Sequence, residues 1–149
     1  MNYFKEAEYI LYNYSKLCIA LNNLKTRKSH LIWGSAPSGK ISTGAACVGS
    51  GSNYSNNAEK DLTELNQTMA NILITENKIN EIDSLLCELA CEERAVIQLW
   101  YFEMITKENM LEKLNIGSLD SLYKKRKKAV GDFAILYFGA VALNLKTAE

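Results

Sequence analysis

The chain has 149 residues, of which 48% are hydrophobic, and it carries no net formal charge at pH 7. Apolar sequence in that proportion can bury a core, which excludes wholesale disorder, and the length fits one compact domain or a small domain with a helical extension. The single proline favours long helices. Because the four cysteines lack the spacing of a disulfide framework, we expect reduced thiols and a cytoplasmic protein.

The charge is unevenly distributed along the chain. Residues 58–103 hold three basic and ten acidic residues, a net charge of −7, whereas residues 104–149 hold eight basic and five acidic residues, a net charge of +3. Five of those basic residues are consecutive, from Lys124 to Lys128. Such a chain can present a basic face to phosphate groups while its acidic part faces elsewhere.

Two stretches of the chain repeat apolar residues in a heptad pattern. The first stretch lies in a helix predicted over residues 2–33 and repeats at Tyr3, Ala7, Ile10, Tyr14, Leu17, Leu21 and Leu24. The second starts at Ala58 and repeats at Leu62, Leu65, Met69, Ile72, Ile79, Ile82, Leu86 and Leu89, with an interruption at Thr75 and Glu76. This pattern predicts long helices that pack lengthwise on another helix.

Residues 34–57, between the two heptad stretches, are rich in Gly, Ser, Ala and Asn and are predicted to form a flexible loop. The helices on either side can then pair as an antiparallel hairpin in one chain, or associate between chains. Because one helix pair buries little surface, we expect a homo-oligomer. We therefore predict an all-α protein with a helical hairpin over residues 1–90 and a second domain over residues 91–149.

Shorter helices follow. The first is predicted over Glu92–Glu103, with an apolar face of Val96, Ile97, Trp100 and Tyr101. Thr106 is expected to cap a helix over Lys107–Leu114, and Ser118 to cap another that begins at Leu119, with a tight turn between them. One side of that last helix carries Leu119, Leu122, Arg126, Ala129 and Phe133. Arg126 thus faces inward, where it either pairs with an acidic group such as Glu93 or contacts a ligand.

Two helices joined by such a turn have the form of a helix-turn-helix, whose second helix enters the major groove of DNA. That helix needs small and polar side chains near its start, where they reach base edges, and cations further along, where they meet phosphates. Asp120 and Ser121 lie in its first turn, and the basic run follows one turn later. The order along the chain therefore matches the order that groove entry requires.

Residues 85–97 resemble the opening of the region-four DNA-binding module of bacterial sigma factors. In that module a leucine and an acidic–arginine pair precede an apolar helix ending in aromatic residues, here Trp100, Tyr101 and Phe102. Residues 106–114, Ser118 and residues 122–129 are similar to the rest of the module. With the long helical segment and polar loop ahead of it, the chain resembles the small phage late-gene activators of the ArpU/RinA type. The turn from Leu114 to Ser118 is one residue longer than usual.

The resemblance implies sequence-specific recognition of promoter DNA and regulation of phage or mobile-element genes in a bacterial cytoplasm, with RNA polymerase as a further partner. Its implied DNA-binding residues are Lys107, Ser118, Asp120, Ser121, Tyr123, Lys124, Lys125, Lys127 and Lys128. Of these, Lys107, Lys127 and Lys128 are expected to contact phosphates.

Other classes of protein are less well supported by the sequence. There is no nucleophile–base–acid set, so we predict neither an enzyme nor a cofactor or metal site, and Cys87 and Cys91 are expected to be buried or half-buried thiols. The apolar run Phe133–Leu143 is too short to span a membrane and is predicted to be a packed C-terminal helix. Two alternatives stay open, namely a small terminase-like DNA-packaging subunit and a coiled-coil adaptor or anti-regulator that binds only protein.

Overall fold

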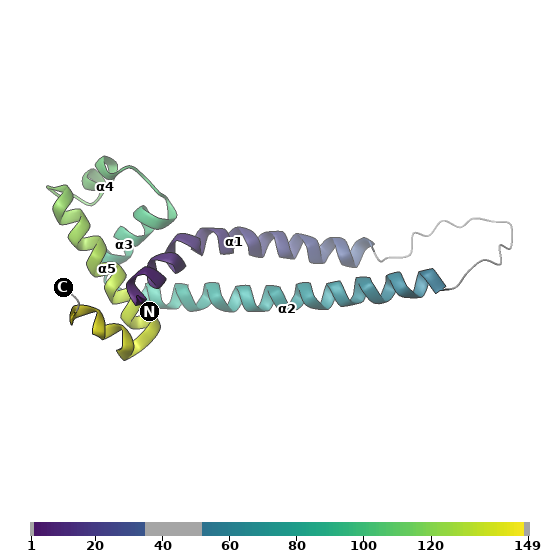
Figure 1. Cartoon of the computed structure of the whole chain (residues 1–149). Helices are drawn as coiled ribbons and strands as arrows, with labels where there is room; N and C mark the ends of the chain where they lie inside the picture. The colour runs from purple at the N-terminus through teal and green to yellow at the C-terminus, as the bar shows by residue number, and fades with distance from the viewer. Residues whose placement is uncertain (1, 35–51, 148–149) are drawn as a thin grey trace. The chain divides into compact units, whose positions relative to one another are not determined.

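The computed structural model describes residues 2–34 and 52–147, and within these ranges every element of secondary structure is helical (Figure 1). The predicted all-α class is confirmed. The α-helices are α1 (Tyr3–Gly34), α2 (Ser52–Glu88), α3 (Cys91–Ile97), α4 (Lys107–Lys113) and α5 (Leu119–Phe138). A π-helical turn, η1 (Gln98–Phe102), continues α3, and a 3-10 segment, η2 (Gly139–Thr147), follows α5.

The predicted loop over 34–57 is too long at both ends, because α1 extends to Gly34 and α2 already begins at Ser52. The rest of that prediction, residues 35–51, lies outside the described residues. The contacts divide the chain into unit 1, made of residues 1–18 and 78–149, and unit 2, made of residues 19–77. The predicted boundary between residues 90 and 91 falls inside unit 1, because the first turns of α1 and the last turns of α2 pack with the shorter helices.

Unit 1 is built around a core of apolar side chains to which α1, α2, α3, η1, α5 and η2 all contribute. Its largest fully buried members include Tyr101 and Phe133. The heptad positions Ala7, Ile82 and Leu86 belong to this core, as predicted, but Leu11 is equally buried and lies outside the predicted repeat. The full set of buried members is Ala7, Leu11, Ile82, Leu86, Leu89, Ile97, Tyr101, Ala129, Val130, Phe133, Ala134 and Ala142.

The junction between α2 and α3 depends on Arg94. Its Nε donates a hydrogen bond to the carbonyl oxygen of Leu86 at 2.8 Å, and its Nη2 donates to that of Cys87 at 2.7 Å. The last carbonyls of a helix have no partner inside the helix and carry the negative end of its dipole, so a guanidinium satisfies both needs. The arginine of the acidic–arginine pair therefore ties the start of α3 to the end of α2.

The segment from α4 to α5 is held by local hydrogen bonds at each boundary. Thr106 and Ser118 cap α4 and α5, accepting from the backbone N–H groups of Asn109 and Ser121, which confirms both predicted caps. At the end of α4, the N–H of Ile116 donates to the carbonyl of Leu111 at 2.9 Å, and the N–H of Asn115 donates to that of Glu112 at 3.2 Å. Asn115 has a positive φ of 52°. These features form a Schellman motif, with asparagine in its left-handed position.

Three predictions about unit 1 are wrong in detail. The helix expected over Glu92–Glu103 changes to π-helical geometry at Gln98. The apolar run Phe133–Leu143 is not one helix, because Gly139 ends α5 with a φ of 74° and η2 follows. Leu119, expected on the inner side of α5, is 44% exposed.

In unit 2, α1 and α2 run antiparallel, as the ion pairs Lys25–Glu76 and Arg27–Glu64 show, since the later residue of α1 meets the earlier residue of α2. The side chains of α2 that are buried or half-buried at regular steps are Leu65, Thr68, Ile72 and Thr75. The heptad is therefore continuous through two threonines. The predicted positions Leu62 and Met69 lie beside this packed line and are exposed instead.

Among the described helices, none has a stretch both long enough and apolar enough to cross a membrane.

The buried side of α2 can be tested with two isoleucines. Ile82 is 0% exposed and Ile74 is 67% exposed. We expect Ile82→Ala to lower the free energy of unfolding by about 2–5 kcal/mol, because it leaves a cavity in the core of unit 1. The matched variant Ile74→Ala should change it by no more than about 0.5 kcal/mol. Urea unfolding followed by circular dichroism measures both, and equal effects would contradict the assignment of the core.

Candidate nucleic-acid interface

Helix α5 has a buried side and an outward side. The buried side packs into the core of unit 1 through Leu122, Ala129, Val130, Phe133 and Ala134. With 3.6 residues per turn, the opposite side carries Asp120, Ser121, Lys124, Lys127 and Lys128, all of which are exposed. We call these five residues the outward face. They include five of the nine residues that the sequence predicted as DNA-binding.

The three small polar residues at the start of α5 have two different roles. The Ser118 hydroxyl accepts from the backbone N–H of Ser121 at 3.3 Å and lies 3.0 Å from the Ser121 hydroxyl oxygen. It therefore holds the first turn of the helix, as expected of a cap. Asp120 and Ser121 are exposed in that turn. The outward face thus begins with two short polar side chains on a backbone that Ser118 fixes.

The lysines of the basic run fall into two groups. The Lys125 ammonium lies 2.6 Å from a carboxylate oxygen of Glu92, and Lys128 pairs with Glu93 and, at 3.4 Å, with Asp132. The hydrogen bond and charge of Lys125 lower the pKa of Glu92, and hydrogen bonds to Glu93 and Asp132 raise the pKa of Lys128. Within residues 2–34 and 52–147, no carboxylate lies at ion-pair distance from Lys124 or Lys127. These two are therefore the unpaired cations of the outward face.

A groove of about 470 Å³ runs beside the outward face. Lys124, Lys127 and Lys128 contribute to its lining, together with Phe4 of α1 and Leu143 of η2. The groove thus begins at Lys124, in the second turn of α5, and continues along the later turns, whereas the first turn lines no part of it.

Lys107, at the start of α4, is held by aromatic rings. Its ammonium hydrogen-bonds the Tyr123 hydroxyl and lies 5.0 Å from the centre of that ring and 5.9 Å from the centre of the Trp100 ring. The two rings contact each other edge to face, with centroids 5.6 Å apart. The structure thus brings Lys107 and Tyr123 together. They form an exposed cation on an aromatic support, joined to the first turns of α5 by Tyr123 itself.

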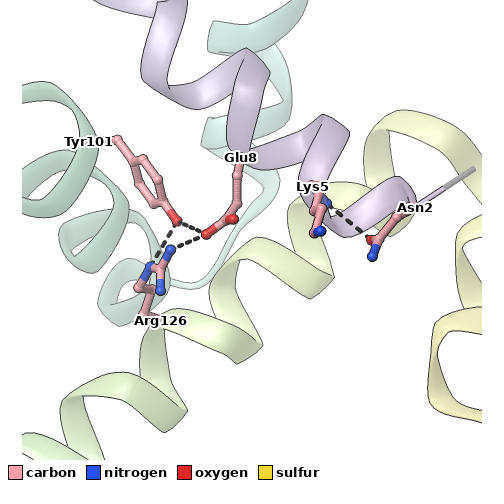
Figure 2. A network of polar contacts seen from close by, with 5 residues as sticks. All are labelled: Asn2, Lys5, Glu8, Tyr101 and Arg126. Carbon is pink, nitrogen blue, oxygen red and sulfur yellow. Dashed lines mark hydrogen bonds and ion pairs between the residues drawn. The ribbon is translucent and has the colours of Figure 1, made fainter. Parts of the chain in front are cut away.

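Behind the outward face, Glu8, Tyr101 and Arg126 form a network that Figure 2 shows. The Tyr101 hydroxyl donates to the Glu8 carboxylate at 2.9 Å and accepts from Arg126 Nε at 2.9 Å. Arg126 Nη2 pairs with the same carboxylate oxygen of Glu8. We call these three residues the buried triad. They join α1, η1 and α5.

Aromatic packing encloses the buried triad. The Arg126 guanidinium carbon lies 4.6 Å from the centre of the Trp100 ring, and Tyr12 packs edge to face on Tyr101 with centroids 4.6 Å apart. Burial raises the pKa of Tyr101, and the nearby Arg126 opposes that shift in part. Arg126 thus faces inward and pairs with an acid, one of the two predicted alternatives. The acid is Glu8, and the predicted partner Glu93 pairs with Lys128 instead.

The nine predicted residues all lie on α4, on α5 or at the cap between them. Of the partners from distant parts of the chain, Glu8 and Glu92 were missed, and Glu93 was predicted for Arg126 and not for Lys128. Glu92 and Glu93 were visible as an acidic pair at the start of a helix, but only their contact with α5 shows that they neutralise two of the lysines. No local sequence pattern distinguishes Glu8 as a partner of Arg126, since it is one of several charges on a long amphipathic helix.

Cys87 and Cys91 are exposed, so the expectation of buried or half-buried thiols is wrong. In the described part of the chain, no three residues of the types His, Cys, Asp and Glu gather in a group fit to hold a metal ion.

Comparison of the chain with protein-family models, with curated proteins and with solved structures finds no match.

The buried triad can be tested through its hydroxyl group. Tyr101→Phe removes the hydroxyl that bonds both Glu8 and Arg126, and we expect the free energy of unfolding to fall by about 1–3 kcal/mol at neutral pH. Folding raises the pKa of Tyr101 above its ordinary value of 10.0. Above about pH 10 the unfolded chain therefore loses the Tyr101 proton while the folded chain still holds it, and the free energy of unfolding falls. The contribution of Tyr101 to stability is thus complete below about pH 10 and is lost as the pH rises further.

The difference in unfolding free energy between wild type and Tyr101→Phe should therefore be constant up to about pH 10 and shrink above it. Urea unfolding at a series of pH values measures this difference. Tyr9→Phe is the control, because Tyr9 is 68% exposed. A difference that stays the same through the alkaline range would contradict the role assigned to Tyr101.

Proposed function

We propose that the chain is a sequence-specific DNA-binding regulator of transcription, in which the N-terminal half of α5 enters the major groove. The observation that carries this proposal is the outward face. It has short polar side chains in the first turn and the unpaired cations Lys124 and Lys127 one and two turns later, opposite a side that is fully packed. Short side chains near base edges and cations near phosphates are what groove binding requires.

Helix α4, which precedes α5, supports the same proposal. α4 ends in a Schellman motif and is followed by the capped start of α5, so the two helices are joined by a turn with defined hydrogen bonds. Lys107, at the N-terminus of α4, then supplies a cation on the same part of unit 1. In a helix-turn-helix the first helix crosses the DNA backbone, where a cation at its start contacts phosphate.

The resemblance to region four of sigma factors and to the ArpU/RinA type of activator supports a more specific proposal. On that basis the chain controls phage or mobile-element genes in a bacterial cytoplasm, acts as a homo-oligomer and contacts RNA polymerase as well as promoter DNA. Several parts of the resemblance have a physical role in unit 1, namely Arg94, the caps at Thr106 and Ser118 and the aromatic cluster Trp100–Phe102.

The proposal predicts that the two unpaired lysines dominate binding to duplex DNA. Lys124→Ala combined with Lys127→Ala should lower affinity roughly tenfold or more and reduce the slope of log K against log salt by about 2, since two phosphate contacts are lost. Gel-shift titrations over a range of salt concentrations measure both quantities. The matched control is Lys5→Ala with Lys16→Ala, which removes two exposed lysines of α1. If both pairs behave alike, α5 is not the recognition helix.

A second prediction concerns the lysines that are already paired. Lys125 and Lys128 must exchange Glu92 and Glu93 for phosphates before they contribute to DNA binding. Glu92→Gln with Glu93→Gln frees both lysines, so we expect DNA affinity to rise several-fold and the salt slope to steepen by up to about 2. Glu81→Gln with Glu88→Gln removes the same charge from the end of α2 and is the control. Equal gains from both pairs would show a general charge effect.

The sequence specificity is tested by mixing the purified chain with fragmented genomic DNA, recovering the bound fragments and sequencing them. Enrichment of one shared motif supports a regulator. Uniform recovery at a salt-dependent level would favour a DNA-packaging subunit, and no recovery at low salt would favour an adaptor that binds only protein.

A further inference from the structure

The described side chains of unit 2 form no buried apolar core. In its parts with described side chains, residues 19–33 and 58–77, the one buried residue is Thr68, and no apolar side chain there is buried. Large apolar side chains are exposed instead, and they include Ile32, Leu62, Met69 and Leu73. Two paired helices that bury so little apolar surface gain little stability from their own packing.

Three of these side chains lie in one line along α2. Leu62, Met69 and Leu73 follow one another at steps of seven and four residues, which places them on one face of the helix. They are 58%, 46% and 59% exposed. Glu76 lies three residues after Leu73, on the same line. The residue of α1 that pairs with Glu76 therefore shows which side of α1 lies next to this line.

That partner is Lys25, whose ammonium lies 2.6 Å from the Glu76 carboxylate. Ile32 follows Lys25 by seven residues and therefore lies on the same line along α1. The other ion pair, Arg27–Glu64, lies on different lines of both helices. Ile32, Leu62, Met69 and Leu73 thus share one side of the helix pair, which we call the apolar side of unit 2.

The charges of unit 2 indicate what covers this side. Residues 19–33 of α1 carry three basic and no acidic residues, a net charge of +3, and residues 58–77 of α2 carry one basic and four acidic residues, a net charge of −3. Lys25 and Glu76 lie on the apolar side itself. A helix pair with one positive and one negative helix is complementary to a second copy after a two-fold rotation, which lays the α1 of each copy over the α2 of the other.

We infer that the apolar side of unit 2 docks a second copy of this chain in a two-fold four-helix arrangement. The interface specifies how the homo-oligomer proposed above is held, and it uses no residue of the DNA-binding α5. Its test contains no DNA, so failure of the dimer and failure of DNA binding are observed separately.

Light scattering coupled to size-exclusion chromatography tests the proposal on the full chain. We expect a mass of twice 16.7 kDa for the wild type at micromolar concentration. Leu73→Lys should raise the dissociation constant at least tenfold and shift the mass to that of a monomer. Ile74→Lys is the matched control. Ile74 is also exposed, and the substitution adds the same charge one residue further along, about 100° around the helix from Leu73. It should leave the dimer intact.

Circular dichroism shows whether each variant keeps its helices, and Met69→Gln is the substitute if Leu73→Lys does not. A wild-type chain that is monomeric throughout the micromolar range overturns the proposal. Equal loss of the dimer in Leu73→Lys and Ile74→Lys overturns it as well.

Charge complementarity between the two copies is tested with two variants. Lys25→Glu with Lys28→Glu makes α1 acidic like α2, and Glu59→Lys with Glu76→Lys makes α2 basic like α1. Each variant alone carries like charges on both helices and should be monomeric, whereas an equimolar mixture should form a heterodimer. If the mixture stays monomeric while both variants remain helical, the charge argument for a second copy is wrong.

Discussion

The geometry of unit 1 depends on the ion pair and hydrogen bonds among Glu8, Tyr101 and Arg126. The three side chains come from helices that are far apart in sequence, and each satisfies a polar group of the other two. A partly buried charge that loses its partner costs more free energy than the pair contributes, so the three must be placed together. Together with the apolar side chains that α5 buries, this requirement fixes the rotation of α5 about its own axis. With Arg126 held inward, Lys124 and Lys127 have to face outward.

The same constraint explains why a run of five basic residues is not a uniformly basic surface. Consecutive residues of a helix point in directions about 100° apart, so a run of five covers every side of α5. One member is taken by the buried triad, two are paired with carboxylates at the start of α3, and two remain for a partner. The number of lysines in a sequence therefore overestimates the cations a helix can offer to phosphate.

The helical class, both caps and the asparagine-containing turn were predictable, because each depends on residues close together in sequence. Ser118 bonds a group three residues away, and Asn115 provides the left-handed conformation that the turn needs. The partners of the lysines were not predictable. The contacts Lys125–Glu92 and Lys128–Glu93 span more than thirty residues, and a sequence pattern gives no means to choose among many acidic residues. The break of α5 at Gly139 was visible only as a glycine in an apolar run.

The heptad of α2 shows how a pattern of apolar residues can mislead. Leu62 and Met69 were assigned to the packed line because they are apolar, yet the line passes through Thr68 and Thr75. A threonine can take such a position because its hydroxyl bonds within its own helix, as Thr75 does to the carbonyl of Asn71 at 2.7 Å, while its methyl group packs. The apolar residues displaced from that line then form a second one. This second line is exposed. In a bundle of more than two helices each helix contacts two neighbours, and the interface proposed above uses the second line for the second contact.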